Sequence, residues 1–180
     1  MNTVIDASSL IVMARVNGLE AVHGVYGPVA LTPAVFEEVV ISGERLGKTD
    51  PWIVKAAIDR GWLRQVVLSS EEESLVASLR QEYRVLGLGE CQALACAEQR
   101  HWLLLVEERK AKAVARARNV AYSIIQVTPF EGYLSGKIVH NHCLELMERI
   151  ATAMGTDLAV LNALKAAVSA IERERKRESP

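Results

Sequence analysis

Short apolar runs alternate with amphipathic segments along the first two thirds of the chain. The runs lie at 3–5, 29–31, 65–68, 102–106 and 120–127, and each is short enough for a buried strand. The segments between them carry apolar residues at helical spacing. Strands that alternate with helices favour a mainly parallel sheet with helices on both faces. The pattern therefore predicts an α/β fold.

Capping residues mark where the predicted helices begin. Thr32-Pro33, Asp50-Pro51 and Thr128-Pro129 each place a capping side chain before a proline at the first helical position. Ser70 with Glu73 predicts a capping box at the start of a long helix.

The chain changes character near residue 140, where two helical segments are predicted at 140–154 and 157–175. In the second segment, heptad a and d positions are occupied by Leu161, Leu164, Val168 and Ile171. An independent coiled coil needs about three to four heptads, more than this segment offers, so the helix is expected to dock on the domain or on a partner. We therefore predict a domain at 1–138 and a C-terminal helical extension, docked or oligomerising, at 139–180.

Length, charge and cysteine usage narrow the class of protein. The chain has 180 residues, half of them hydrophobic, which suffices for one domain with an appendage. A net charge of −1 excludes a globally basic nucleic-acid coat but allows a local basic patch. Three cysteines without a CxxC pair argue against a disulfide framework and favour a reducing cytoplasm. Asp6 interrupts the N-terminal apolar run, so no signal peptide is expected. No run approaches the roughly 20 residues of a membrane span.

Residues 86–119 concentrate the candidate chemistry. A glycine turn opens onto a helix that carries Glu90 in its first turn, and Glu107 and Glu108 follow the apolar run that ends at 106. Glu90 shares a helical stripe with apolar residues, and a carboxylate on the core side must be neutralised, hydrogen-bonded or bound to a cation. The alternative is that the helix dipole alone favours an acid there. The glycines do not form a dinucleotide fingerprint, because Gln92 occupies the place of its third glycine.

Further acids are expected at the same edge of the sheet. Asp6 directly follows the first predicted strand, although Asp6 or Ser8 could simply cap the next helix. Glu37 and Glu38 flank an apolar helical face symmetrically, so periodicity cannot choose between them, and either could be a solvated surface acid. The carboxyl ends of parallel strands share one edge, where ligands bind in open α/β sheets.

Carboxylates that converge cannot all remain ionised unless a cation shares the site. Oxygen ligands without histidine or thiolate favour Mg²⁺ or Mn²⁺ over zinc. Elsewhere, His140, His142 and Cys143 have no second ligand cluster, which argues against zinc.

A basic helix follows these acids directly. Between 109 and 118 there are five basic residues and no acid, and Arg109, Lys112 and Arg116 share one face. A solvated amphipathic helix would show the same composition. Its position beside the acids favours contacts with a nucleic-acid backbone.

Four segments together carry a family resemblance: VIDASSLI at 4–11, LTPAVFEEV at 31–39, LGLGECQALACA at 86–97 and LLLVEERKAKAVA at 103–115. In this order and spacing the chain resembles PIN-domain proteins, specifically the small prokaryotic branch related to VapC-type toxins. The resemblance covers roughly residues 1–138. It implies a PIN-like α/β/α sandwich, a metal-dependent ribonuclease that acts as the toxin partner of a small antitoxin, and a homodimer.

The resemblance also implies roles for individual residues. It places the first acid at Asp6 with Ser8 as supporting hydroxyl, the second at Glu38 rather than Glu37, and the third at Glu90. The fourth acid is usually an aspartate, and here that position is Glu107, one methylene longer, with Glu108 beside it as a supporting acid.

The leading hypothesis is a cytoplasmic Mg²⁺- or Mn²⁺-dependent ribonuclease with Asp6, Glu38, Glu90 and Glu107 as catalytic metal ligands, and with RNA held by Arg109, Lys112 and Arg116. The first alternative is a catalytically degenerate PIN module that binds RNA or a protein without cleavage. The second is a structural protein that assembles through its C-terminal helices.

Overall fold

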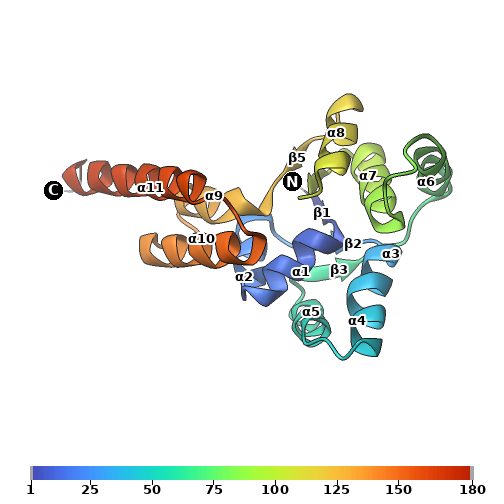
Figure 1. Cartoon of the computed structure of the whole chain (residues 1–180), viewed down its shortest axis with the longest axis horizontal. Helices are drawn as coiled ribbons and strands as arrows, with labels where there is room; N and C mark the ends of the chain where they lie inside the picture. The colour runs from blue at the N-terminus through green and yellow to red at the C-terminus, as the bar shows by residue number, and fades with distance from the viewer. Residues whose placement is uncertain (1, 179–180) are drawn as a thin grey trace.

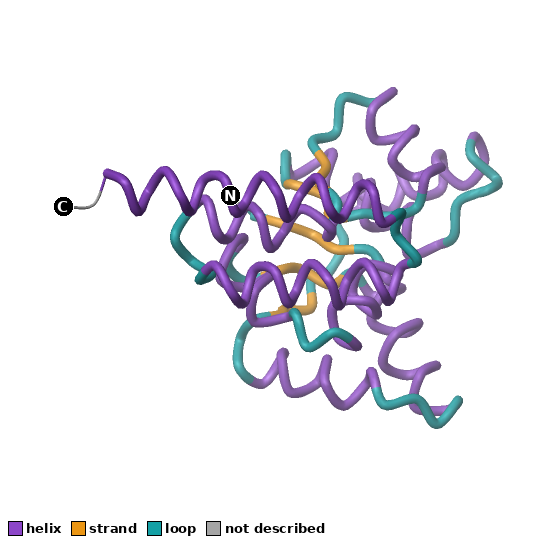
Figure 2. Tube along the Cα trace, turned by 60° about the vertical axis from the view of Figure 1, so that its left-hand side comes forward, coloured by secondary structure: helices purple, strands orange, loops and turns teal. Residues whose placement is uncertain are grey.

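The computed structural model describes residues 2–178, so position 1 of the predicted domain and positions 179–180 of the predicted extension lie outside the described residues. Within 2–178, five parallel strands form one sheet in the order β3-β2-β1-β4-β5. The strands are β1 (Thr3–Ile5), β2 (Val29–Leu31), β3 (Leu63–Gln65), β4 (Leu103–Leu105) and β5 (Tyr122–Ser123). Helices surround this sheet on both faces (Figure 1, Figure 2). The prediction of an α/β/α sandwich is confirmed.

The helical elements are α1 (Ala7–Arg15), α2 (Leu19–Tyr26), α3 (Pro33–Phe36), the π-helical turn η1 (Glu37–Ile41), α4 (Ser42–Arg45), α5 (Asp50–Asp59), α6 (Ser70–Glu82), α7 (Leu88–Arg100), α8 (Arg109–Ala117), the 3₁₀ turn η2 (Ile125–Val127), α9 (Thr128–Leu134), α10 (His140–Met154) and α11 (Leu158–Glu178).

The two faces of the sheet bury different hydrophobic clusters. Ile5 and Leu105 pack on one face with residues of α1, α2, α5 and α10. Val4 and Leu104 pack on the other face with residues of α6, α7 and α8. Successive side chains of a strand point to opposite faces. The central strands β1 and β4 are therefore buried on both sides, which explains why their sequences are apolar runs.

Two predicted strands have different limits in the structure. The run at 65–68 was expected to be a strand, but β3 lies two residues earlier, because Val29 pairs with Leu63 and the ladder ends where Val66 N–H donates to Leu31 O. The strand predicted at 120–127 is only β5. Its ladder stops because the N–H of Ile125 donates to the carboxylate of Glu107 instead of to a strand.

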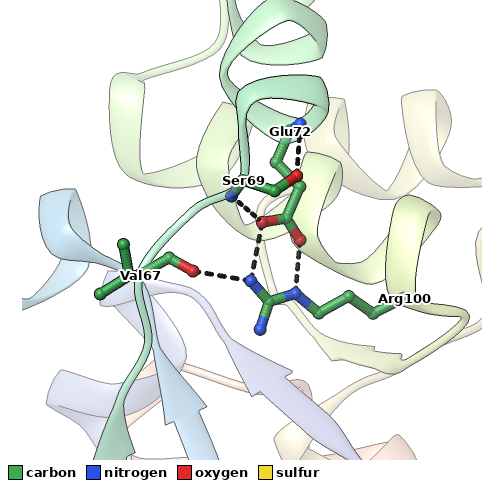
Figure 3. Close-up of polar contacts among 4 residues, drawn as sticks. All are labelled: Val67, Ser69, Glu72 and Arg100. Carbon is green, nitrogen blue, oxygen red and sulfur yellow. Dashed lines mark hydrogen bonds and ion pairs between the residues drawn. The ribbon is translucent and has the colours of Figure 1, made fainter.

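The predicted capping box of α6 is shifted by one residue. Ser69, not Ser70, is the cap: its Oγ accepts from Glu72 N–H at 3.3 Å, and Glu72 Oε2 accepts from Ser69 N–H at 2.7 Å. The Glu72 carboxylate also accepts hydrogen bonds from Arg100 Nε at 2.5 Å and from Arg100 Nη2 at 2.7 Å (Figure 3). The same Nη2 donates to Val67 O at 2.7 Å. This cluster ties the start of α6 to the end of α7.

Of the two C-terminal helices, α10 packs against α1 and α9, and α11 packs against α10 and α9. Leu146 and Ile150 of α10 are fully buried in the hydrophobic cluster that contains β1 residues. Leu161 and Val168 of α11 are buried as well, and Tyr133 OH donates to Glu172 near the far end of α11 at 2.7 Å. Figure 1 shows α10 and α11 side by side, extending away from the sheet.

In the described part of the chain, no helix has both the length and the apolar character needed to cross a membrane.

Candidate active site

Asp6 lies at the carboxyl end of β1 and is almost completely buried, with 1% of its surface exposed. It is the N-cap of α1: Oδ1 accepts from Ser9 N–H at 2.8 Å, and Oδ2 accepts from Ser8 Oγ at 2.9 Å. Burial raises the pKa of Asp6, although these bonds and the backbone N–H of Glu107 act in the opposite direction. Asp6 therefore both caps α1 and lies at the carboxyl edge of the sheet.

Glu37 and Glu38, which periodicity could not distinguish, point to different neighbours. Glu37 lies 3.7 Å from Arg45 and its side chain is 57% exposed. Glu38 faces α7, since a Cβ atom at Gly89 would lie 3.5 Å from its Oε2. Both residues belong to the π turn η1, in which one extra residue per turn changes the direction of the side chains. Such turns often occur at functional sites.

Gln92 fixes the approach of α3 to α7. Its Oε1 accepts from Ala34 N–H at 2.8 Å, at the start of α3. Thr32, expected to cap this helix, makes no side-chain capping bond within residues 2–178. The sequence pattern did not predict this role of Gln92. The available signal was a single polar residue in the otherwise apolar segment that follows Glu90.

Glu90 occupies the third position of α7, and its Oε2 accepts from Gly87 N–H at 2.6 Å. Burial is the largest cause that raises the pKa of Glu90, and the charges of Asp6, Glu108 and Glu38 raise it further. Glu90 therefore stabilises the start of α7, as the alternative interpretation of this acid predicted. The same carboxylate also lies within the electrostatic reach of three other acids.

Glu107 and Glu108 follow β4 but differ in their surroundings. Glu107 is half-buried, and its Oε1 accepts from Ile125 N–H at 2.7 Å. Burial raises the pKa of Glu107, whereas the Ile125 bond and the charge of Lys112 lower it. Glu108 is the exposed N-cap residue of α8 and makes no side-chain capping bond among the residues described.

A metal ion places definite requirements on these acids. Their oxygen-only donor set suits a hard divalent cation. Among residues 2–178, however, no three histidine, cysteine or acidic side chains lie close enough together to hold a metal ion as they stand. The charges of Asp6, Glu108 and Glu38 nevertheless act on Glu90, and each raises its pKa. Like charges at such a site favour a bound cation or a proton.

Two clefts flank these acids. One has a volume of about 690 Å³ and is lined by Arg109, Lys112, Ala113, Arg116, Tyr122, Ser123, Ile124 and Val127. The three basic residues of the predicted RNA-binding face therefore lie on the same cleft, and Arg116 donates to Tyr122 OH at 2.7 Å. The other cleft, of about 530 Å³, lies between α3 and α7 and includes Glu38 and Gln92.

Comparison with known families finds a match between residues 2–124 and a family model described as a PIN domain. The matched region runs from β1 to β5 and contains every acid of the candidate site. No curated protein matches the chain.

Proposed function

Because the chain belongs to the PIN-domain family, whose members are generally nucleases, we propose that it is a metal-dependent ribonuclease that hydrolyses RNA phosphodiester bonds. The observation that carries this proposal is the position of three acids: Asp6 follows β1, Glu38 faces the start of α7, and Glu90 lies in the first turn of α7. A cleft lined by basic side chains begins at the start of α8.

The acidic residues have a defined part in this proposal. Asp6, Glu38 and Glu90, with a fourth carboxylate from the pair Glu107 and Glu108, would hold Mg²⁺ or Mn²⁺. When bound, such an ion polarises a phosphate and activates water. Ser8 holds one oxygen of Asp6 and so fixes the direction of the carboxylate.

The basic cleft would hold the RNA. Arg109, Lys112 and Arg116 present positive charge on one wall, where backbone phosphates bind without regard to sequence. The positive charge of Lys112 lowers the pKa of Glu107, so this wall lies next to the acids. A strand bound along the cleft would therefore pass the acidic edge of the sheet.

The resemblance to VapC-type toxins supports three further proposals. The protein acts in the cytoplasm as the toxin of a toxin–antitoxin pair, a small antitoxin protein binds it, and it forms a homodimer.

A second candidate function is a degenerate PIN module that binds RNA without cutting it. One observation favours it: a carboxylate oxygen of Glu107 is already taken by the Ile125 N–H, at the position where the resemblance expects an aspartate.

The test is cleavage of a panel of structured and single-stranded RNAs with Mn²⁺, with Mg²⁺ and with chelator. Glu90→Gln keeps an oxygen for the Gly87 N–H, so the variant should fold normally and show an unchanged circular dichroism spectrum. We expect a loss of cleavage of at least about 100-fold, because even outer partners of metal ligands are worth 10–100-fold.

The matched control is Glu73→Gln, because Glu73 is an exposed acid in the first turn of α6. This variant should cleave RNA as the wild type does. Equal cleavage by Glu90→Gln would refute the assignment of the site. Binding of RNA by the wild type without metal-dependent cleavage would favour the degenerate module.

A further inference from the structure

The cleft between α3 and α7, which we call the α3–α7 cleft, lies on the carboxyl edge of the sheet. It begins at Pro33, two positions after β2 ends, whereas the basic cleft is lined by residues of β5 and of the segments that follow β4 and β5. In the sheet, β1 lies between β2 and β4, and Asp6 directly follows β1. The two clefts therefore lie on either side of Asp6, and RNA that runs along this edge reaches both.

The lining of the α3–α7 cleft suits a nucleobase better than a phosphate. Pro33 and Ala34 of α3 and Leu88 of α7 make part of its surface apolar, and its volume is about 530 Å³, large enough for a small ligand. Glu37 and Glu38 line the same cleft, and their charges repel a phosphate. An uncharged base avoids this repulsion, and its flat faces pack well against apolar side chains.

Gln92 gives this cleft a hydrogen-bond donor whose direction is fixed. The donor to its side chain is the N–H of Ala34 at 2.8 Å, so the accepting atom must be Oε1, and the other end of the amide is Nε2. Among residues 2–178, Nε2 donates to no protein atom, and it is not one of the buried polar atoms closed off from solvent. The bond to Ala34 thus leaves a free N–H₂ group on the cleft.

This N–H₂ group distinguishes bases by the edge that they present. Guanine and uracil have a carbonyl next to a ring N–H, whereas adenine has no carbonyl and the carbonyl of cytosine lies next to a ring acceptor. Gln92 can donate to the carbonyl, and the adjacent ring N–H can donate to a carboxylate of Glu37 or Glu38 in the same cleft. In a duplex this edge is paired with the other strand, so only an unpaired base can use the cleft.

We propose that the α3–α7 cleft binds one unpaired RNA base with a carbonyl next to a ring N–H, which is guanine or uracil, and that Gln92 selects it. This inference rests on the proposed function, because it requires RNA to bind along the acidic edge. It gives the two clefts different tasks: the basic cleft holds the backbone without regard to sequence, and the α3–α7 cleft reads one base.

The base preference is measured as RNA binding in chelator, where no metal-dependent cleavage takes place. Four fluorescently labelled oligocytidines of equal length carry uridine, guanosine, adenosine or cytidine at one central position. We expect fluorescence anisotropy to show that the wild type binds the uridine and guanosine forms about 5–10-fold more tightly than the other two. The reason is that adenine and cytosine leave a polar group of the cleft without a partner.

Gln92→Glu tests the residue that we hold responsible. The variant keeps an oxygen for the Ala34 N–H but replaces the N–H₂ group with a second oxygen, which can only accept. Its added negative charge weakens the binding of all four oligonucleotides, so the informative quantity is the ratio of their affinities. We expect the four affinities of Gln92→Glu to lie within about 2-fold of each other.

The matched control is Leu88→Ala. Leu88 lines the same cleft and is 45% exposed, so its loss removes packing against the base but no hydrogen bond. This variant should bind all four oligonucleotides more weakly by a similar factor and keep the preference of the wild type. Circular dichroism spectra equal to that of the wild type show that both variants are folded.

The outcomes separate this inference from the proposed function. Equal affinity of the wild type for all four oligonucleotides would overturn the inference, and so would a preference that persists in Gln92→Glu or disappears in Leu88→Ala. A preference for uridine alone or guanosine alone would support the cleft and identify its base. Metal-dependent cleavage without a base preference would leave the proposed function intact. A base preference without cleavage under any metal condition would support the cleft and overturn the ribonuclease activity.

Discussion

Arg100 neutralises a carboxylate that has almost no access to water, and replacing it with methionine tests how strongly the α6–α7 pair depends on it. The side chain of Glu72 is 1% exposed and that of Arg100 is 27% exposed. Two parallel N–H groups of Arg100 reach the two oxygens of Glu72, and a third bond goes to Val67 O (Figure 3). Arg100→Met retains much of the apolar side-chain stem but removes all three bonds.

The expected loss of unfolding free energy in Arg100→Met follows from the buried charge of Glu72, which the variant leaves without its partner. Removing one partner of a buried ion pair costs about 3–5 kcal/mol, because the other charge stays buried without compensation. Glu72 would keep its bond from Ser69 N–H, and water can reach the side of the pair that Arg100 now covers. We therefore expect the free energy of unfolding to fall by about 3 kcal/mol, at the lower end of that range.

The loss should depend on pH in a defined direction. The hydrogen bonds from Arg100 are the main cause that lowers the pKa of Glu72 in the folded protein. In the wild type this stabilisation is fully present above the unfolded pKa of about 4.3 and is lost as the pH falls through the lower folded pKa. In Arg100→Met, burial raises the pKa of Glu72, so protonation removes the buried charge. The difference between the two proteins should therefore be largest at pH 7 and shrink toward pH 4.

Urea denaturation at pH 7 and pH 4.5 measures both effects. The matched control is Arg64→Met, because Arg64 lies over the Trp102 ring at 5.3 Å as Arg100 does at 4.9 Å, but is exposed and has no buried acid as partner. The control should lose less than about 1 kcal/mol. A loss below about 1 kcal/mol in Arg100→Met, or an equal loss at both pH values, would refute this account of the pair.

Two further predictions concern other parts of the molecule. Leu146→Ala in α10 should lower the free energy of unfolding by about 2–5 kcal/mol in urea, because Leu146 is fully buried against the main core, and a loss below about 1 kcal/mol would show that α10 is dispensable for it. Gln92→Met should lower it by about 1 kcal/mol, because the Ala34 N–H loses its acceptor, whereas Gln92→Glu keeps an oxygen there and should stay close to the wild type. Equal stability of the two Gln92 variants would contradict the capping role.

The order of the elements could be predicted from the sequence, because each central strand is a short apolar run bounded by a helix start. The strands at 3–5 and 29–31 have the predicted limits. The limits of β3 and β5 could not be predicted, since each depends on a bond to a distant residue. Val29 fixes the register of β3, and Glu107 takes the N–H that would have continued β5.

The candidate site, too, could be predicted from the sequence only in part. That acids gather at the carboxyl edge follows from where Asp6 and Glu107 stand relative to their strands. Periodicity could not choose between Glu37 and Glu38, because it assumes a regular α-helix and the structure has a π turn there. Nor could it reveal that Gln92 caps α3, because a hydrogen bond between two helices leaves no pattern in either one.

The position of β1 in the middle of the sheet has a consequence for how the protein folds during synthesis. Thr3 pairs with Val29 on one side but with Leu103 on the other, one hundred positions later in the chain. A ribosome adds about 5–20 residues per second, and contacts between distant segments form late. Until β4 has emerged, β1, which ends just before Asp6, therefore has no strand partner on one side. A nascent chain that lacks β4 cannot assemble the acidic edge, so we expect any activity of that edge to appear only after β4 has emerged from the ribosome.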